Sequence, residues 1–314
     1  MNKSIVLIGG SGFIGLNFAN YFFSKNYRVR IICRNKFDMS RLISNNIEIH
    51  ILDIKETNKL LDAISGFENI IWLANTLIPG IKIINETDAF NDNVLPIINF
   101  FKNNNDTVYF KKFIYISSGG TIYGNNESNS PSNETSKTDP ISLYGKIKLQ
   151  SENYIKYYSN TVKSDIYIIR PSNVYGIYQN FNKPQGIIGF LFKSVLENGT
   201  IDIYGDGNII RDYINVADLT FAIFLCLESI HISNKLSIYN IGSDIGYTIN
   251  DLISLINTIT NHNIKTNVLP PRDFDCNFNI LDSNKIKNEL TGFFIFPPPV
   301  CDISHDAKRH CSQI

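Results

Sequence analysis

The sequence predicts an α/β protein built on a doubly wound parallel sheet, with a smaller lobe formed by its C-terminal half. Three observations support this fold class. Across residues 1–170, short apolar segments alternate with segments whose apolar residues have helical spacing. The apolar segments are continuous, as in strands that are covered by helices on both faces. A glycine-rich junction joins the first strand to the first helix, which is typical of such sheets.

The elements of the predicted sheet follow from β-branched and aromatic residues. Ser4–Ile8 is the first strand, and a helix over residues 13–23 follows it with Phe13, Phe18 and Phe22 on one face. Further strands are predicted at Val29–Ile32, Ile47–Leu52, Asn69–Leu73, Phe113–Ile116 and Tyr167–Ile169.

Pro96 interrupts one predicted helix, which spans Asp88–Lys102. A proline in a regular helix interior removes a hydrogen bond and costs about 3 kcal/mol. We therefore expect this helix to kink at Pro96, or to end and restart there.

The pattern becomes less regular after Pro171. Residues 171–292 are predicted to form mainly the smaller lobe, with some elements returning to the sheet, and residues 293–314 an atypical tail. The polar segment 125–139 is predicted to be a surface loop. Helices are expected at Gly186–Leu196, Val216–Leu227 and Ile249–Ile259. An extended segment is expected at Ile201–Tyr204 and a turn at Tyr204–Gly207.

Composition excludes several classes of protein. The 29 Lys and Arg residues balance 29 Asp and Glu residues, which argues against binding nucleic acid or anionic membranes by bulk electrostatics. A hydrophobic content of 43% excludes extensive disorder. Five scattered cysteines indicate reduced thiols rather than a disulfide framework. The sequence shows neither a signal-peptide pattern nor a long apolar run. We therefore expect a cytoplasmic protein without a membrane-spanning segment.

The glycine-rich junction predicts a dinucleotide site. Gly9, Gly12 and Gly15 form a G-x-x-G-x-x-G pattern directly after the first strand. Glycines there permit a tight turn and a close approach to a pyrophosphate, while the helix start at Phe13 and Ile14 offers free N–H groups.

The end of the second strand bears on which dinucleotide is bound. An acid there would accept the ribose hydroxyls of NAD, but the sequence has Cys33 followed by Arg34. Because a guanidinium can pair with a 2′-phosphate, we favour NADP(H), with NAD as the alternative. Arg34 could instead be solvated or stack on adenine. Asp53, after the third strand, either contacts adenine or is an ordinary loop residue.

Tyr144 and Lys148 form a Tyr-x-x-x-Lys pair at the start of a predicted helix. Their spacing places both side chains on one face. A free phenol has a pKa near ~10, and a neighbouring ammonium would lower it, so the pair suits proton transfer at a carbinol carbon.

The pair follows the glycine-rich junction by about 130 residues and comes after a strand that ends in Ser117-Ser118. Together these features resemble the extended short-chain dehydrogenase/reductase family of nucleotide-sugar epimerases, dehydratases and 4-ketoreductases. The resemblance spans roughly residues 3–290. It implies a Rossmann sheet, a homodimer formed through two helices, and cofactor contacts from Leu73, Ala74, Asn93, Ser117 and Pro171.

The sequence departs from the family at the catalytic hydroxyl. The family usually places a Ser or Thr four residues before the tyrosine of a Tyr-Gly pair, and here that position is Gly119. We expect Ser118 and Thr121 to act together instead, although either hydroxyl could bond only to backbone. A dinucleotide-binding scaffold without activity is the weakest alternative.

The resemblance also assigns a substrate site for a nucleotide-diphosphate sugar. It implies that Asn173 and Arg211 contact the diphosphate, and that Arg272 and Asp275 lie near the base and ribose. Arginines suit such a ligand because they pair bidentately with phosphate oxygens. Either arginine alone could be solvated or salt-bridged.

Two activities follow from the resemblance. One is NADPH-dependent reduction of a dTDP-4-keto-6-deoxyhexose, for surface polysaccharides such as the O-antigen of lipopolysaccharide. The other is 4-epimerisation of UDP-glucose or UDP-N-acetylglucosamine with tightly bound NAD. Arg34 favours the reductase, and frequency within the family favours the epimerase. A dehydratase is less favoured because Gly120 and Thr121 cannot supply its acid pair.

No metal site is predicted. The tail contains Cys301, His305, His310 and Cys311, but their spacing matches no compact zinc pattern.

Overall fold

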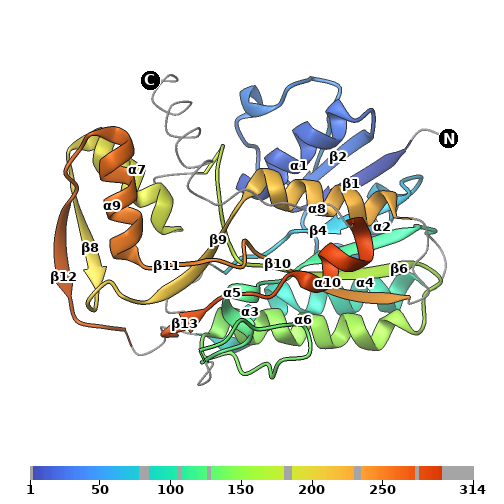
Figure 1. Ribbon diagram of the computed structural model, residues 1–314. Helices are drawn as coiled ribbons and strands as arrows, with labels where there is room; N and C mark the ends of the chain where they lie inside the picture. Colours follow the sequence, from blue (N-terminus) through green and yellow to red (C-terminus); the bar gives the residue numbers. More distant parts are fainter. Residues whose placement is uncertain are drawn as a thin grey trace.

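The computed structural model describes residues 3–77, 85–104, 108–125, 129–179, 186–229, 235–272 and 276–291. Its centre is a seven-stranded parallel sheet with the strand order β10-β6-β5-β4-β1-β2-β3 (Figure 1). The order reverses between β1 and β4, and ligands of such sheets bind at this switch point. The predicted doubly wound sheet is confirmed.

Six of the seven strands lie close to predicted segments, whereas β10 was not predicted. β1 and β4 are buried along their whole length, because the sheet is covered on both faces. The bounds are Ser4–Ile8 (β1), Arg28–Cys33 (β2), Glu48–Ile51 (β3), Asn69–Trp72 (β4), Lys112–Ile116 (β5), Asp165–Pro171 (β6) and Leu236–Ile241 (β10).

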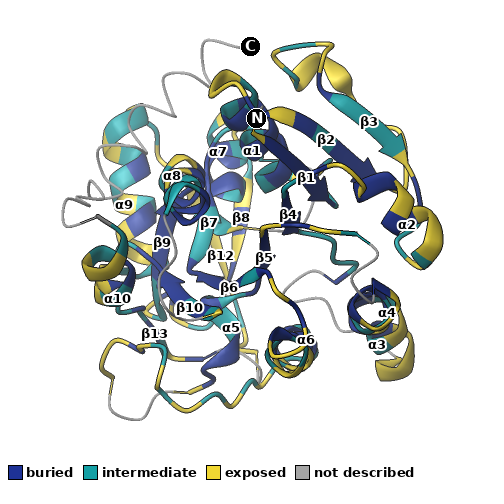
Figure 2. Ribbon diagram, turned by 90° about the vertical axis from the view of Figure 1, so that its right-hand side faces the viewer, coloured by how far each residue is buried: buried dark blue, intermediate teal, exposed yellow. Residues whose placement is uncertain are grey.

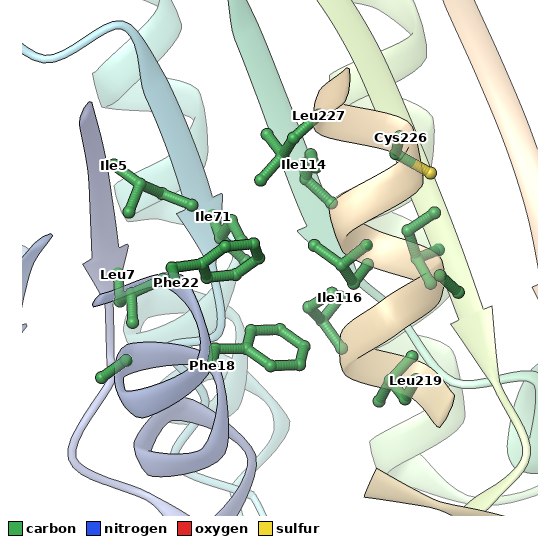
Figure 3. Packing of buried hydrophobic residues seen from close by; sticks show 14 of the residues in the cluster. Ile5, Leu7, Phe18, Phe22, Ile71, Ile114, Ile116, Leu219, Cys226 and Leu227 are labelled. Carbon is green, nitrogen blue, oxygen red and sulfur yellow. The ribbon is translucent and has the colours of Figure 1, made fainter. Parts of the chain in front are cut away.

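Helices α1 (Phe13–Ser24) and α8 (Val216–Glu228) cover one face of the sheet. Figure 3 shows Phe18 and Phe22 of α1 on the side turned toward α8, which carries Leu219, on the same face of the sheet. Each fully buried side chain of this kind contributes about 1.5–3 kcal/mol.

The other face is covered by α2 (Thr57–Ile64), α4 (Leu95–Asn104) and α6 (Leu143–Ser159), with α3 (Glu86–Asn93) beside α4 and α6 (Figure 2). Here Phe100 of α4 stacks on Phe113 of β5, with ring centroids 5.6 Å apart. This contact packs α4 against β5.

Pro96 acts as predicted. α3 ends at Asn93 and α4 begins at Leu95, so Pro96 is the second residue of a new helix. There its missing N–H interrupts no hydrogen bond, because first-turn N–H groups have no intrahelical partner.

The smaller lobe lies apart from the sheet, on the left of Figure 1. Helices α7 (Ile187–Glu197) and α9 (Ile249–Thr260) pack on each other, and β8 (Thr200–Tyr204) pairs with β12 (Lys265–Leu269). A second small sheet centres on β9 (Ile210–Asn215), which pairs with β7 (Asn173–Tyr175), β11 (Gly246–Tyr247) and β13 (Phe278–Asn279). The chain then returns to the large sheet through α8 and β10.

Short helical turns complete the described part: η1 (Met39–Arg41), α5 (Gly119–Ile122), α10 (Asn284–Ile286) and η2 (Lys287–Thr291). Within the polar segment 125–139, Ser132 is anchored by a hydrogen bond from its N–H to the carbonyl of Ile280. None of the helices in the described ranges is both long and apolar enough to cross a membrane. Asp275 and the tail from residue 292 lie outside the described residues.

Candidate active site

Two cavities meet at the carboxyl ends of the central strands. A cleft of about 730 Å³ runs past the ends of β1, β2, β4 and β5. A cavity of about 740 Å³ lies between α7, β8 and β9 in the smaller lobe. Thr121 and Asn173 line both, so the two spaces adjoin at these residues.

The glycine-rich junction forms one wall of the cleft. A Cβ added to Gly9, whose φ is +81°, would lie 2.5 Å from the backbone of Ala74, and one added to Gly15 would lie 2.4 Å from the Cα of Gly10. A Cβ added to Gly12 would meet no atom within 4 Å. Gly9 and Gly15 are therefore required by chain packing, whereas Gly12 borders open space in the cleft.

This space suits a pyrophosphate. Gly12 is the N-cap of α1, no side chain caps that end, and its first turn contains no acidic residue. The N–H groups and the positive end of the helix dipole at Phe13 and Ile14 are therefore available to an anion. The residues present fit a bound dinucleotide.

The end of the cleft beside β2 and β3 is rich in cations. We call it the adenosine end, because a bound dinucleotide would place its adenosine there. Arg34, Lys36, Arg41 and Lys55 all line it. Lys55 pairs with Asp92 at 2.5 Å, and Arg41 lies 3.8 Å from Asp38. Among the described residues, no carboxylate lies within ion-pair distance of Arg34.

Two further groups at this end are not cations. The thiol of Cys33 stands where an acid would bind ribose, and burial raises its pKa while the Ser11 hydroxyl partly offsets the effect. Asp53 also lines the cleft, and its carboxylate accepts the N–H of Lys55 at 3.0 Å.

Tyr144 and Lys148 line the other end of the cleft, on the first turns of α6. The ammonium of Lys148 donates to the carbonyl of Ile116 at 2.8 Å and lies 5.8 Å from the centroid of the Tyr144 ring. Burial raises the pKa of Tyr144 to about 12, which the Ser118 hydroxyl partly offsets. Burial also lowers the pKa of Lys148 to about 7, against the attraction of Glu152.

The two proposed catalytic hydroxyls lie near the Tyr144 phenol and the junction of the cavities. Ser118 is the N-cap of α5 and interacts with Tyr144. The Thr121 hydroxyl is buried and has no hydrogen-bond partner within the described ranges. Gly119 faces elsewhere, since a Cβ there would lie 2.6 Å from a methyl group of Leu281. The sequence departure therefore leaves two hydroxyls beside the cleft.

Ser117, one of the predicted cofactor residues, lines the cleft and also belongs to a buried polar network. Its hydroxyl donates to Glu152 at 2.6 Å. The guanidinium of Arg170 grips the same carboxylate with contacts of 3.0 and 2.6 Å, and also donates to the Tyr123 hydroxyl at 2.9 Å. Tyr123 in turn donates to Asn240 at 2.6 Å. The network ties α6 to β6 and β10.

The remaining predicted cofactor residues divide into two groups. Leu73, Ala74 and Pro171 line the cleft. Asn93 is buried, and its side chain accepts the N–H of Thr76 at 2.7 Å. Because Thr76 lines the cleft, Asn93 supports the wall rather than forming it. Thr76 was missed by the sequence analysis, although its place just after β4 could have indicated it.

Three of the residues predicted to bind substrate line the second cavity. Arg211 and Arg272 line it, and the Arg272 guanidinium lies 4.5 Å from the centroid of the Tyr204 ring. Asn173 donates from its side chain to the carbonyl of Asp212 at 2.8 Å. The sequence analysis missed Tyr204 as a lining residue, although it marked the turn beginning there.

The comparisons with known proteins agree with this geometry. Residues 5–242 match the model of the NAD dependent epimerase/dehydratase family. A Methanocaldococcus jannaschii protein provisionally named UDP-glucose 4-epimerase is 31% identical over 256 residues, covering 80% of this chain and 81% of that protein. An Escherichia coli dTDP-4-dehydro-6-deoxyglucose reductase is 31% identical over 237 residues, covering 76% of this chain and 73% of the reductase.

Among solved structures, the UDP-glucose 4-epimerase of Thermotoga maritima with UDP-glucose superposes with a TM-score of 0.90 at 25% identity, covering 99% of both chains. The match spans the sheet and the smaller lobe alike. With the family model covering most of the chain and the Tyr144–Lys148 pair beside a dinucleotide cleft, this chain belongs to the NAD-dependent epimerase/dehydratase family of extended short-chain dehydrogenase/reductase enzymes.

Proposed function

We propose that this enzyme transfers hydride at C4 of a nucleotide-diphosphate hexose and acts as a 4-epimerase. The observation that carries the proposal is the position of Tyr144 and Lys148 beside the junction of the two cavities at Thr121 and Asn173. Relatives named as UDP-glucose 4-epimerases support the epimerase over the reductase that Arg34 favoured.

In this proposal, the second cavity holds the sugar nucleotide. Arg211 and Asn173 contact its diphosphate, and Arg272 lies near its base and ribose. Tyr144 accepts the proton of the C4 hydroxyl and returns it after the sugar has turned over. With NAD bound, the positive charges of a protonated Lys148 and of the oxidised nicotinamide would oppose the burial that raises the pKa of the phenol. A bound NAD would supply the hydride acceptor.

A second candidate is an NADPH-dependent reductase of a dTDP-4-keto-6-deoxyhexose, serving surface polysaccharides such as O-antigen. The specific observation in its favour is the set of cations at the adenosine end. Arg34 and Lys36 could pair with the 2′-phosphate of NADP(H). The similarity to the Escherichia coli reductase also supports it. In this case Tyr144 gives its proton to the C4 oxygen.

One experiment separates the candidates. Purified protein is incubated with UDP-glucose and with a dTDP-4-keto-6-deoxyhexose, each with and without NADPH. A C4 epimer formed without added cofactor supports the epimerase. Stoichiometric consumption of NADPH with the keto sugar supports the reductase. Turnover of neither substrate, in a preparation that binds dinucleotide, would overturn both, and Tyr144→Phe provides the inactive control.

We also propose that two copies of the chain pair through the outer faces of α4 and α6. Leu95, Tyr154 and Tyr157 expose apolar or aromatic surface there, at 36%, 38% and 68%. Replacing Tyr157 and Tyr154 by lysine should give a monomer in sedimentation velocity, while the same change at exposed Phe221 on α8 should leave the dimer intact.

A further inference from the structure

Asp212 is a fully buried acid in the middle of β9, directly after Arg211. Alternation along the strand places Ile210, Asp212 and Ile214 on one face and Arg211 on the other. A carboxylate thus occupies a position in an apolar register. The activity described so far gives it no role.

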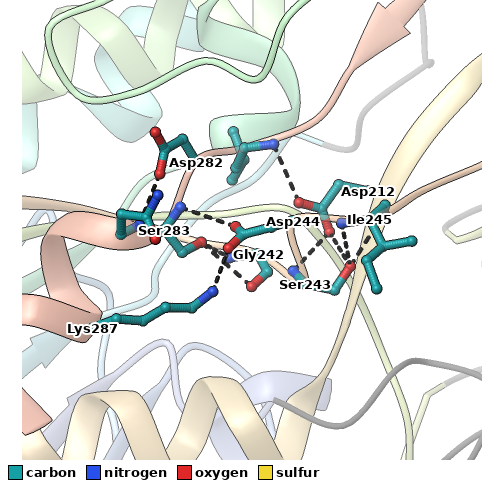
Figure 4. Close-up of polar contacts among 10 residues, drawn as sticks. Asp212, Gly242, Ser243, Asp244, Ile245, Asp282, Ser283 and Lys287 are labelled. Carbon is teal, nitrogen blue, oxygen red and sulfur yellow. Dashed lines mark hydrogen bonds and ion pairs between the residues drawn. The ribbon is translucent and has the colours of Figure 1, made fainter. Parts of the chain in front are cut away.

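The two oxygens of Asp212 hold two different segments (Figure 4). Oδ1 accepts the N–H of Ser243 at 2.9 Å and its hydroxyl at 2.8 Å. Oδ2 accepts the N–H of Leu281 at 3.2 Å. Gly242 permits this approach, since a Cβ there would lie 2.2 Å from Oδ2.

These segments lead into the two strands that flank Arg211. The Cα partners of Arg211 are Tyr247 in β11 and Asn279 in β13. Ser243 lies shortly before β11, and Leu281 shortly after β13. One carboxylate therefore fixes an end of each strand that sets the position of Arg211.

The same residue also reaches the other ligand-facing groups. Its backbone carbonyl accepts the side-chain amide of Asn173. The Leu281 side chain, whose N–H it holds, packs against Gly119 at the start of α5, between Ser118 and Thr121. Asp212 thus connects β9, the strand that carries Arg211, with the turn at α5 that carries the proposed catalytic hydroxyls.

We propose that Asp212 is a positioning residue, which acts through Arg211 and Asn173 to align the diphosphate of a sugar nucleotide with Tyr144. The inference rests on the proposed function in that the second cavity must take a sugar nucleotide. It goes beyond that function by requiring that affinity for the sugar nucleotide, and not affinity for the dinucleotide, depends on the Asp212 contacts.

The test is Asp212→Asn, titrated by calorimetry at pH 8 with UDP-glucose, dTDP-glucose, NAD and NADPH. The asparagine keeps the shape but turns an N–H group toward the N–H of Leu281 or of Ser243, so one segment is released. Affinity for the sugar nucleotide that wild type binds should fall about tenfold, which corresponds to about 1.4 kcal/mol. Affinity for the dinucleotide should stay within about twofold.

Two further variants keep the test decisive. Ser243→Ala removes the hydroxyl contact with Asp212 and the weaker contacts of that hydroxyl with the backbone of Ile245 at 3.2 Å, but it keeps the N–H contact with Asp212. It should lower sugar-nucleotide affinity about threefold. Asp244→Asn is the matched control. Asp244 lies in the same turn and pairs with Lys287 and the N–H of Ser283, so its loss should lower thermal stability without changing nucleotide affinity.

The outcomes are distinct. Unchanged sugar-nucleotide affinity in Asp212→Asn overturns the inference, as does an equal loss of dinucleotide affinity, which would indicate a general structural role. If Asp212→Asn does not fold, Ser243→Ala decides by the same criteria. Failure of wild type to bind either sugar nucleotide would instead refute the proposed function.

Discussion

Among the described residues, the sheet half and the smaller lobe each bury one carboxylate completely, but the two carboxylates have different partners. Glu152, on the inner side of α6, is gripped by the guanidinium of Arg170. Asp212 is held only by the neutral groups of Ser243 and Leu281. Burial raises the pKa of Asp212 to about 6, and its three hydrogen bonds only partly offset this.

This difference separates the tasks of the two regions. Beside the cofactor cleft and the Tyr144–Lys148 pair, the buried charge of Glu152 is paired with the guanidinium of Arg170. β9, the strand that carries Arg211, is held by Asp212, which has no cationic partner among the described residues and whose pKa is about 6. Changes in the sheet half should therefore affect chemistry and global stability, and changes in the lobe should affect sugar-nucleotide binding.

The largest expected effect is on catalysis. Tyr144→Phe removes the proton carrier and should lower kcat by about 10²- to 10⁴-fold with little change in KM. Arg211→Met should instead raise KM, because it removes a contact with the diphosphate while leaving the phenol in place. Steady-state kinetics provide the measurement. An equal loss of kcat in both variants would contradict the division between chemistry in the sheet half and substrate binding in the lobe.

Global stability gives the next effect. Glu152→Gln leaves Arg170 buried without a counter-charge and should lower the free energy of unfolding by about 3–5 kcal/mol. Asp212→Asn strands no cation and should cost less than about 2 kcal/mol. Urea unfolding of both variants provides the measurement, and equal losses would show that charge pairing does not distinguish the two regions.

The pH dependence of stability tests whether Asp212 is buried without a counter-charge. Because the folded-state pKa of Asp212 is raised from 3.8 to about 6, its stabilising contribution is fully present below pH 4 and is lost as the pH rises through 6. The nearby charges are Asp244, which adds to this shift, and its partner Lys287. Stability of wild type relative to Asp212→Asn should fall across this range, by at most about 1.4 kcal/mol per pH unit. A flat difference would contradict it.

The smallest effect concerns an exposed charge. Arg34→Ala should weaken NADPH binding about tenfold, or about 1.4 kcal/mol, because it removes a partner of the 2′-phosphate, and should leave NADH binding nearly unchanged. Arg28→Ala is a matched control at the start of β2, the strand that Arg34 directly follows, since Arg28 pairs with Glu48 at 2.6 Å. Equal weakening of both cofactors by Arg34→Ala would remove the argument for NADP(H). Fluorescence titration measures both.

The same two regions differ in how far sequence predicts them. Strands such as Ser4–Ile8 were predicted within one or two residues because a parallel strand is a continuous apolar segment flanked by turns. The restart at Pro96 was predicted because it follows from the chemistry of one residue. β11 and β13 were not identified, because each spans two residues and exists only through pairing with β9.

The site shows a similar division. Gly9, Gly12, Tyr144 and Lys148 could be identified because their roles depend on spacing within single elements. Asp212 could not, although its place between Ile210 and Ile214 was a signal, because its contacts come from segments 31 and 69 residues away. Asn93 was assigned to the cofactor, yet its contact with the cleft passes through Thr76.

The contact between Gly119 and Leu281 has a consequence for how this lineage can change. A Cβ at position 119, where the family usually has a hydroxyl residue, would lie 2.6 Å from a Leu281 methyl group and 2.9 Å from the carbonyl oxygen of Arg170. A smaller residue at 281 alone would leave a cavity behind α5 and cost stability. It would also leave the contact with the Arg170 backbone, so a side chain at 119 requires changes at Leu281 and in β6 together.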